Sequence, residues 1–235
     1  IGDKIVCYSI APWTNSVVYY DEATKTTVKK RLTPGSEEWT TIWTAFLNDL
    51  ADHLYEKGWF NDAYIGIDER GFNKAAFDLI DSIKRGIPTP LKLKSAGAMD
   101  GFVEKKDLAM RVDDLNVGSI AVKAHPQQFE EIRQAREDAG LRTTIYTCTG
   151  HKPGNFSLSA PGESYWTMMY SYSVGGEGYL RWAYDSWVEN PLEDTTHNAF
   201  EAGDCFLVFP DDSEAKVTKS STRFEKMAEG VRDVN

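Results

Sequence analysis

The chain of 235 residues has little cysteine, no long apolar run and no cluster of basic residues. Its three cysteines, Cys7, Cys148 and Cys205, are too few and too far apart for a disulfide framework or a zinc cluster. The longest apolar runs have only a few residues, whereas a membrane-spanning helix needs about 20. We therefore expect no membrane insertion, and the first residues show no signal-peptide pattern.

Acidic residues exceed basic ones, with 36 Asp plus Glu against 26 Lys plus Arg and a net charge of -10. Nucleic acids and anionic membranes require concentrated positive charge, so neither is an expected partner. The four histidines, His53, His125, His151 and His197, lack the spacing of metal ligands. Phosphate-binding glycine motifs and the GxSxG motif are also missing, so no cofactor is expected. The sequence does not predict the oligomeric state.

Apolar residues recur at spacings of three and four in several segments, which predicts amphipathic helices. The clearest runs from about Ser36 to Lys57, with Ser36 as its N-terminal cap and Gly58 ending it. Trp39 and Trp43 on this helix are assigned to the core. Weaker patterns predict helices at 73–85, 126–139, 162–173 and 222–233, with a short one near 104–111.

Short apolar runs of strand length lie between these helices. They are Lys4–Ile10, Tyr64–Ile67, Leu91–Ala96, Ser119–Lys123, Thr143–Thr147 and Tyr179–Ala183. Such runs alternating with helices indicate an α/β fold with a parallel sheet buried by crossover helices. A doubly wound open sheet and an eightfold β/α barrel both fit this alternation. Because no linker divides the sequence, a single domain over residues 1–235 is expected.

Ligands bind at the carboxyl ends of the strands in both architectures. The residues that follow the predicted strands include Trp13, Asp68, Glu69, His125, Cys148, His151, Tyr184, Asp185 and Trp187. Carboxylates, aromatic rings and histidines are therefore expected to gather at one edge of the sheet.

Adjacent acids are common in this chain, and Asp21-Glu22 lies in a Thr- and Lys-rich stretch that predicts a hairpin or solvated loop. Asp68-Glu69 differs because it directly ends the run Tyr64–Ile67. Consecutive strand residues point to opposite sides, so the two carboxylates can contact different parts of one ligand. A structural alternative remains, in which one acid caps the next helix and the other pairs with the following arginine.

Seven tryptophans and eleven tyrosines exceed what a core of this size needs. Several aromatic residues fall at predicted strand ends, namely Trp13, Tyr146, Trp182, Tyr184 and Trp187. Aromatic faces stack on the apolar faces of sugar rings, and carboxylates bind sugar hydroxyls. This pattern favours a carbohydrate ligand, although core packing is the alternative for each single aromatic.

Several longer motifs together resemble a known family. They are Cys7–Trp13, Tyr19–Glu22, His53–Trp59, Tyr64–Arg70, Thr144–Cys148, Leu180–Trp187 and Asn190–Leu192, and toward the end Gly203-Asp204, Phe206–Pro210 and Ser221–Gly230. These segments resemble the catalytic domain of glycoside hydrolase family 123, which has many bacterial members. The resemblance spans nearly the whole chain.

The resemblance implies a (β/α)8 barrel of the TIM type in which an Asp-Glu pair ends the fourth strand. Here the pair ends the second predicted strand, so we expect an incomplete barrel of about six β/α units that lacks the first two. The chain would then be the C-terminal portion of a longer protein. The resemblance also implies that this longer protein is secreted or periplasmic.

The resemblance further implies a retaining glycosidase that acts on 2-acetamido sugars, such as N-acetylgalactosamine, by substrate-assisted catalysis. Glu69 would be the general acid and base, and Asp68 would orient the acetamido group. Candidate sugar-binding residues are Tyr146 for the acetamido oxygen, Trp182, Tyr184 and Asp185 for the pocket wall and hydroxyls, and Trp13 and His151 at the rim.

Two alternatives remain open at this point. A non-catalytic carbohydrate-binding barrel would keep the aromatic residues without turnover. A glycosidase could also use a second protein carboxylate in place of the acetamido group, and Asp185 is the obvious partner for Glu69 in that scheme.

Overall fold

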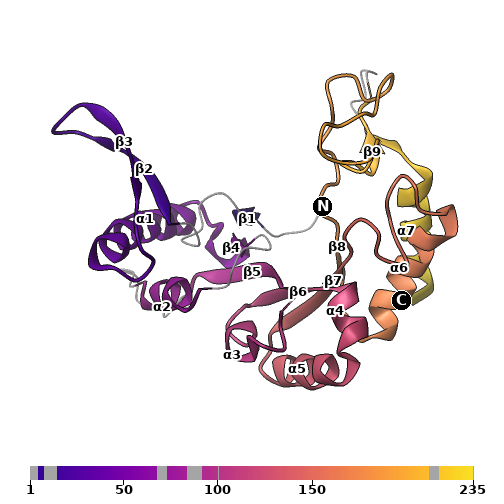
Figure 1. Cartoon of the computed structure of the whole chain (residues 1–235), viewed down its shortest axis with the longest axis horizontal. Helices are drawn as coiled ribbons and strands as arrows, with labels where there is room; N and C mark the ends of the chain where they lie inside the picture. The colour runs from indigo at the N-terminus through magenta and orange to yellow at the C-terminus, as the bar shows by residue number, and fades with distance from the viewer. Residues whose placement is uncertain are drawn as a thin grey trace. The chain divides into compact units, whose positions relative to one another are not determined.

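A computed structural model describes residues 5–7, 15–67, 73–83, 92–99, 101–211 and 217–234, with only the backbone described for 5–7. The chain has an α/β fold and forms two compact units, Ile1–Leu115 and Asn116–Asn235 (Figure 1). Along the described part of the main sheet the strand order is β1-β4-β5-β6-β7-β8. The boundary between the units falls inside β6 (Asp114–Gly118).

Parallel strands form the sheet of the first unit. Its strands are β1 (Ile5–Cys7), β4 (Ala63–Ile67) and β5 (Lys94–Met99), with Ile5 opposite Ala63 and Tyr64 opposite Lys94. All residues of β5 after Lys94 are buried, as expected for a parallel strand covered on both faces. The strand predicted at 64–67 is confirmed, and β5 begins three residues later than predicted.

Helix α1 (Glu37–Glu56) confirms the clearest helix prediction. The Ser36 side chain accepts a hydrogen bond from the Trp39 N–H at 3.4 Å, which satisfies one of the unpaired N–H groups at the helix start. Gly58 follows the helix with a φ of 72°, a conformation that suits glycine. Trp39 and Trp43 are buried, as predicted, and the 3-10 helix η2 (Phe60–Asp62) leads into β4.

The polar stretch around Asp21-Glu22 forms a hairpin, which was one of its two predicted conformations. Strands β2 (Ser16–Asp21) and β3 (Thr26–Arg31) pair antiparallel, and the hairpin extends away from the sheet of this unit (Figure 1). The Asp21 carboxylate accepts hydrogen bonds from the N–H groups of Ala23 and Thr24 at 2.8 and 3.3 Å. Asp21 therefore has a structural role in the turn.

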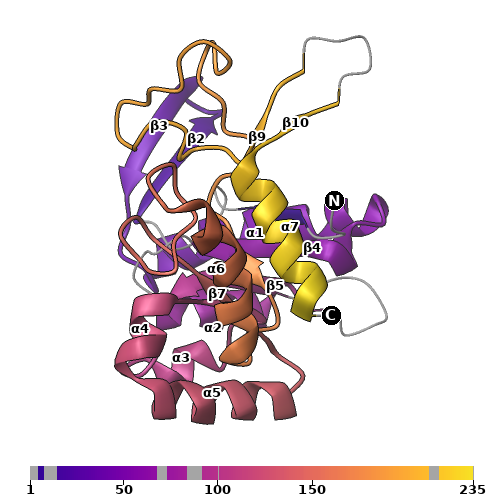
Figure 2. The ribbon, with the colours of Figure 1, turned by 90° about the vertical axis from the view of Figure 1, so that its right-hand side faces the viewer.

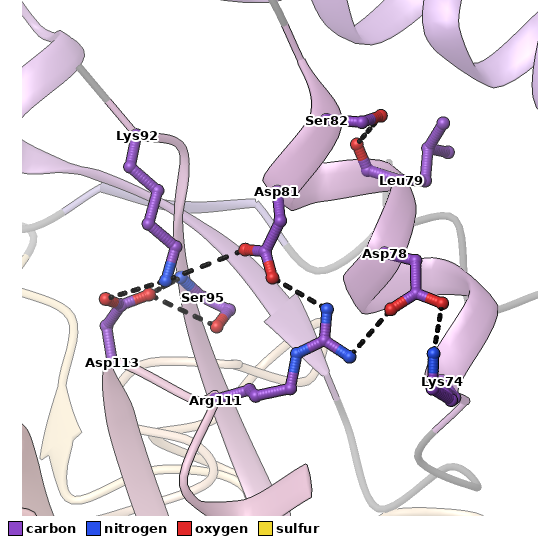
Figure 3. Close-up of polar contacts among 9 residues, drawn as sticks. All are labelled: Lys74, Asp78, Leu79, Asp81, Ser82, Lys92, Ser95, Arg111 and Asp113. Carbon is purple, nitrogen blue, oxygen red and sulfur yellow. Dashed lines mark hydrogen bonds and ion pairs between the residues drawn. The ribbon is translucent and has the colours of Figure 1, made fainter. Parts of the chain in front are cut away.

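Ion pairs connect helix α2 (Lys74–Ser82) with the segment after the short helix α3 (Lys106–Ala109). Arg111 donates to Asp78 at 2.8 Å and to Asp81 at 2.6 Å, and Figure 3 shows its guanidinium group between the two carboxylates. Lys92 lies 3.8 Å from Asp81 and 3.5 Å from Asp113. Asp113 in turn accepts from the Ser95 N–H at 2.8 Å, so the network reaches β5.

The second unit contains the end of β6 and most of the remaining helices. Its elements are α4 (Ser119–Ala124), α5 (Pro126–Asp138), β7 (Arg142–Tyr146), α6 (Pro161–Ser173), β8 (Tyr179–Leu180), β9 (Val208–Phe209), β10 (Lys219–Ser220) and α7 (Thr222–Val234). Strands β7 and β8 are parallel, with Tyr146 opposite Leu180, and β9 and β10 are antiparallel. The helices predicted at 126–139, 162–173 and 222–233 are confirmed to within one residue at each end.

The strand predicted at 119–123 is wrong, because these residues form helix α4 and the strand is β6, which ends at Gly118. A short apolar run has no periodicity that separates a strand from a helix. The true strand contains Asp114, Asn116 and Gly118, which disfavour strands. Asn116 is nevertheless buried, and its side-chain amide donates to the Thr144 hydroxyl on β7.

Helices α6 and α7 lie side by side in the second unit (Figure 2). A Cβ atom at Gly230 would lie 2.7 Å from the Tyr165 carbonyl oxygen and 2.9 Å from the Met168 Cβ, so only glycine permits this approach. The Tyr165 hydroxyl donates to Asp233 at 3.0 Å. Within the described part of the chain, no helix combines the length and the apolar character needed to cross a membrane.

Replacing the buried Trp39 with alanine is expected to lower the free energy of unfolding by about 3–5 kcal/mol, because a large cavity replaces a side chain that is 1% exposed. Tyr55→Ala on the same helix is the control, since Tyr55 is 46% exposed. Urea unfolding monitored by circular dichroism measures both changes. Similar losses of unfolding free energy for the two variants would show that α1 does not bury the face that contains Trp39 and Trp43.

Arg111→Gln is expected to lower the free energy of unfolding by about 1 kcal/mol at neutral pH, since the pairs with Asp78 and Asp81 are partly exposed. Lys74 and Arg111 hold the pKa of Asp78 below its usual range. This carboxylate therefore stabilises the fold fully above its unfolded-state pKa of about 3.9, and the contribution is lost as the pH falls through the lower folded-state value.

The difference in the free energy of unfolding between wild type and Arg111→Gln should accordingly shrink below about pH 4. Urea unfolding at several pH values measures this free energy for both proteins. Lys25→Gln, which removes an exposed pair with Glu22 in the hairpin, serves as the control and should have little effect. If Arg111→Gln lowers the free energy of unfolding by the same amount at every pH, the loss comes from packing against Phe77 and not from the ion pairs. The centre of the Phe77 ring lies 5.3 Å from the guanidinium carbon.

Candidate functional site

The predicted catalytic pair, Asp68 and Glu69, lies outside the described residues, as does Trp13. In chain order the pair follows Ile67, the last residue of β4. Helix α2 is capped by Asn73, whose side-chain oxygen accepts from the Ala75 N–H at 2.9 Å. The N-cap of α2 is therefore occupied by Asn73, contrary to the structural alternative in which one of the two acids is this cap.

His151 lies in the connection between β7 and α6, close to the start of α4. Its Nδ1 atom accepts from the Cys148 N–H at 3.1 Å and lies 3.0 Å from the Ser119 Oγ atom. The Cys148 N–H can only donate, so this contact favours the ring form in which Nδ1 carries no proton. The two contacts hold the orientation of the ring.

A serine hydroxyl bonded to histidine can form a nucleophile and base, but this pair does not fit that role. Ser119 is fully buried, so its hydroxyl is closed to a substrate. Its contact with His151 instead connects the end of β6 to the loop after β7. Ser119 was missed in the sequence because the strand was predicted to begin at this residue, when the strand ends just before it.

Tyr146 is the last residue of β7, as predicted, but its side chain is only 6% exposed. The next residue, Thr147, has its hydroxyl 2.6 Å from the hydroxyl of the neighbouring strand residue Tyr179. Burial raises the pKa of Tyr179. Tyr146 is therefore buried, and Tyr179 is half-buried on the neighbouring strand.

Trp182, Tyr184 and Asp185 follow β8 and are exposed, as candidate sugar-binding residues should be. Trp182 and Tyr184 are 51% and 43% exposed. The Trp182 ring packs on Phe200, with centroids 4.8 Å apart and planes inclined by 36°. The Tyr184 ring meets Phe224 of α7 edge to face at 5.8 Å. Each exposed aromatic is thus supported on one side by another ring.

Backbone hydrogen bonds hold the segment that contains these residues. The Leu207 N–H donates to the Tyr184 carbonyl at 2.8 Å, and Asp185 pairs with Phe206 in an antiparallel bridge. The Ser186 N–H donates to the Cys205 carbonyl at 3.1 Å. We define residues 182–185 as the aromatic rim. Its main chain is fixed by the buried segment that ends in β9.

Two partly buried arginines hold the segment that supports the aromatic rim. Arg223 of α7 donates to the carbonyl oxygens of Gly203 and Phe206 at 2.7 and 2.8 Å. Arg181 donates to the Asp204 carbonyl and lies 4.7 Å from the centre of the Phe156 ring. Burial lowers the pKa of both arginines, and the charge of Asp204 opposes this. The arginines thus hold the carbonyl groups of the turn that supports the rim.

Asp204 completes this cluster. Its carboxylate is fully buried and accepts from the N–H and the hydroxyl of Ser157 at 2.6 and 2.7 Å. An isolated buried charge is costly, and the hydrogen bonds from Ser157 together with the nearby positive charges of Arg181 and Arg223 reduce that cost for Asp204. The cluster therefore joins the loop before α6 to the segments that follow β8.

In the second unit Trp182, Tyr184 and Asp185 lie within four consecutive residues and are all exposed, while Tyr146 is buried and His151 is held by Ser119. The supporting rings Phe200 and Phe224 were missed in the sequence. Neither lies within an apolar pattern that marks a strand end, so no local signal could have found them. Among the described residues, no group of His, Cys, Asp or Glu is arranged to hold a metal ion.

Comparison with known proteins identifies related sequences. The family profile described as glycoside hydrolase 123, catalytic domain, matches residues 1–235. A solved structure, described as a structural analysis of glycolipid glycan hydrolysis by a family 123 glycoside hydrolase from Clostridium perfringens, is 40% identical to this chain with a TM-score of 0.85. The match covers 98% of this chain and 40% of that one, so the chain spans well under half of the solved protein.

None of the curated proteins matches the chain. The profile match extends over all 235 residues, and the solved family member shares both the sequence and the fold of nearly the entire chain. The chain belongs to glycoside hydrolase family 123 and corresponds to its catalytic domain.

Proposed function

We propose that this protein is a retaining glycosidase that hydrolyses glycosides of 2-acetamido sugars, of the N-acetylgalactosaminidase type. The observation that carries the proposal is family membership combined with an Asp-Glu pair directly after β4. The aromatic rim supports it, because exposed rings beside a carboxylate suit a sugar. The related Clostridium perfringens enzyme is described as acting on glycolipid glycans, and such glycans are proposed substrates here as well.

In the proposed reaction, Glu69 donates a proton to the leaving oxygen while the acetamido oxygen of the substrate attacks the anomeric carbon. An oxazolinium intermediate forms and the glycosidic bond breaks. Water then attacks the same carbon, Glu69 takes its proton, and the ring of the intermediate opens. Two inversions at one carbon retain the configuration.

Asp68 has a separate role in this scheme. Its carboxylate accepts a hydrogen bond from the acetamido N–H, which orients the attacking oxygen. The same negative charge stabilises the positive charge that develops on the acetamido group. Glu69 must therefore be protonated and Asp68 ionised when the substrate binds.

The remaining site residues are proposed to bind the sugar. Trp182 and Tyr184 supply aromatic faces, Asp185 accepts from hydroxyl groups, and Tyr146 donates to the acetamido oxygen. His151 and Trp13 are assigned to the rim of the pocket.

We further propose that the parallel sheet is part of a (β/α)8 barrel in a secreted or periplasmic protein. From β4 through β7 each strand is followed by one or two helices, which is compatible with such a barrel. The solved relative is a longer chain, with room for further β/α units.

Glu69→Gln should lower kcat/KM by about 10²–10⁴-fold for glycosides with poor leaving groups, because the general acid is lost. The loss should be smaller for a 4-nitrophenyl N-acetylgalactosaminide, whose leaving group needs little protonation. Steady-state kinetics with aryl and alkyl glycosides of the same sugar measure the difference. Equal losses on the two substrates would contradict the general-acid role.

Asp68→Asn should reduce kcat on acetamido glycosides by about 10²-fold or more, since it removes an interaction that strengthens in the transition state. The matched control is Asp185→Asn, which should mainly raise KM. A rate unaffected by Asp68→Asn would refute the role of Asp68.

A loss of kcat for Asp185→Asn as large as that for Glu69→Gln would instead favour the scheme with a second protein carboxylate. Saturable sugar binding without any hydrolysis would favour the binding barrel.

A further inference from the structure

Unpaired hydrogen-bond donors lie within the cluster of Arg181, Asp204 and Arg223. The Nε and Nη1 atoms of Arg181 and the Nη1 atom of Arg223 are buried and have no hydrogen-bond partner in the described part of the chain. Buried polar groups are usually paired, because an unpaired donor loses its hydrogen bonds to water without replacement. We propose that the two arginines bind one small monovalent anion, such as chloride, which accepts from these N–H groups. This inference goes beyond the proposed function and does not depend on the proposed reaction.

Both guanidinium groups are anchored on the same turn, residues 203–206. Arg181, which follows β8, donates through its Nη2 atom to the Asp204 carbonyl. Arg223 of α7 donates through its own Nη2 atom to the carbonyls of Gly203 and Phe206 at 2.7 and 2.8 Å. Burial lowers the pKa of Arg223, and the nearby charge of Arg181 lowers it further, so the two guanidinium groups repel each other. An anion bound to both would relieve this repulsion.

The charges of the cluster favour a monovalent ligand. Two arginines and one aspartate leave one positive charge uncompensated. The Asp204 carboxylate accepts from the N–H and the hydroxyl of Ser157, and among the described residues it forms no direct ion pair with either arginine. One chloride ion would make the cluster neutral, which lowers the cost of burying its charges. A divalent anion such as sulfate would leave an excess of negative charge.

The number of unpaired donors favours an ion over a single water molecule. Nε carries one N–H and each Nη1 atom carries two, so five N–H groups of the two arginines lack a partner. A buried water makes about three hydrogen bonds, and it must donate as well as accept. A halide ion only accepts. The Oδ2 atom of Asp204 is also buried and unpaired, and a water molecule beside the ion can donate to it.

The ion would connect the segments that support the aromatic rim. Arg181 directly precedes the rim, and Arg223 lies on α7. The turn that both arginines hold continues to Leu207, whose N–H donates to the Tyr184 carbonyl at 2.8 Å. An ion that binds this arrangement and not the unfolded chain stabilises the folded state. Stability should therefore depend on the identity of the anion in solution.

The first test exchanges one sodium salt for another at constant ionic strength, so that general screening stays the same. Replacing about 200 mM gluconate, which is too large for the site, with chloride or bromide should raise the unfolding temperature of the wild-type chain. A dissociation constant of about 10 mM gives a rise of about 3 °C or more. Arg223→Gln should lose this rise. Arg232→Gln should keep it and is the matched control, because Arg232 is an exposed arginine of the same helix.

The second test locates the ion directly in the wild-type chain, and it therefore holds even if Arg223→Gln does not fold. Crystals grown in sodium bromide should show anomalous scattering from bromine within about 3.5 Å of the Nη1 atoms of Arg181 and Arg223. A water molecule at this position, with bromide bound only at exposed side chains as an adventitious ion, would overturn the proposal. Equal unfolding temperatures of the wild-type chain in gluconate and in bromide would also overturn it.

Discussion

Burial of the parallel strands is the constraint on which the rest of the structure depends. All five residues of β6 are buried, and so are the last five of β5. A strand that is covered on both faces must satisfy each polar group within the protein. The Asn116 amide therefore pairs with Thr144. Chemistry that needs solvent or substrate is confined to the residues beyond the strand ends, which is where the candidate residues of both units lie in the chain.

Local signals in the sequence predicted much of the fold. The cap at Ser36, the apolar spacing of α1 and the apolar runs of β4 and β7 are each set by neighbours within a few residues. Strand β6 could not be found in this way, because its polar residues are stabilised by a partner 28 positions later in the chain. The apolar run that follows it has the length of a strand but forms α4.

The candidate site also combines features that follow from nearby residues with features that depend on long-range contacts. Tyr184 and Asp185 follow the predicted strand Tyr179–Ala183 and are exposed. The end predicted for this strand was wrong, because β8 stops at Leu180, and Trp182 therefore lies beyond the strand. The sequence could not predict that Tyr146 is buried or that Phe200 and Phe224 support the rim, because these depend on long-range packing. The roles of Asp68 and Glu69 stay predictions. What the structure adds for them is that Asn73 occupies the N-cap of the following helix.

The aromatic rim has a thermodynamic consequence. Trp182 and Tyr184 keep apolar ring surface in contact with water, although each is supported by another ring. Arg181 and Arg223 hold main-chain carbonyl groups of the segment that supports the rim, and Asp204 is held by Ser157, so this segment is fixed before a ligand binds. A ligand that covers these rings releases their hydration water. Covering these rings therefore contributes a negative term to the heat-capacity change of binding, whatever the balance of enthalpy and entropy at one temperature.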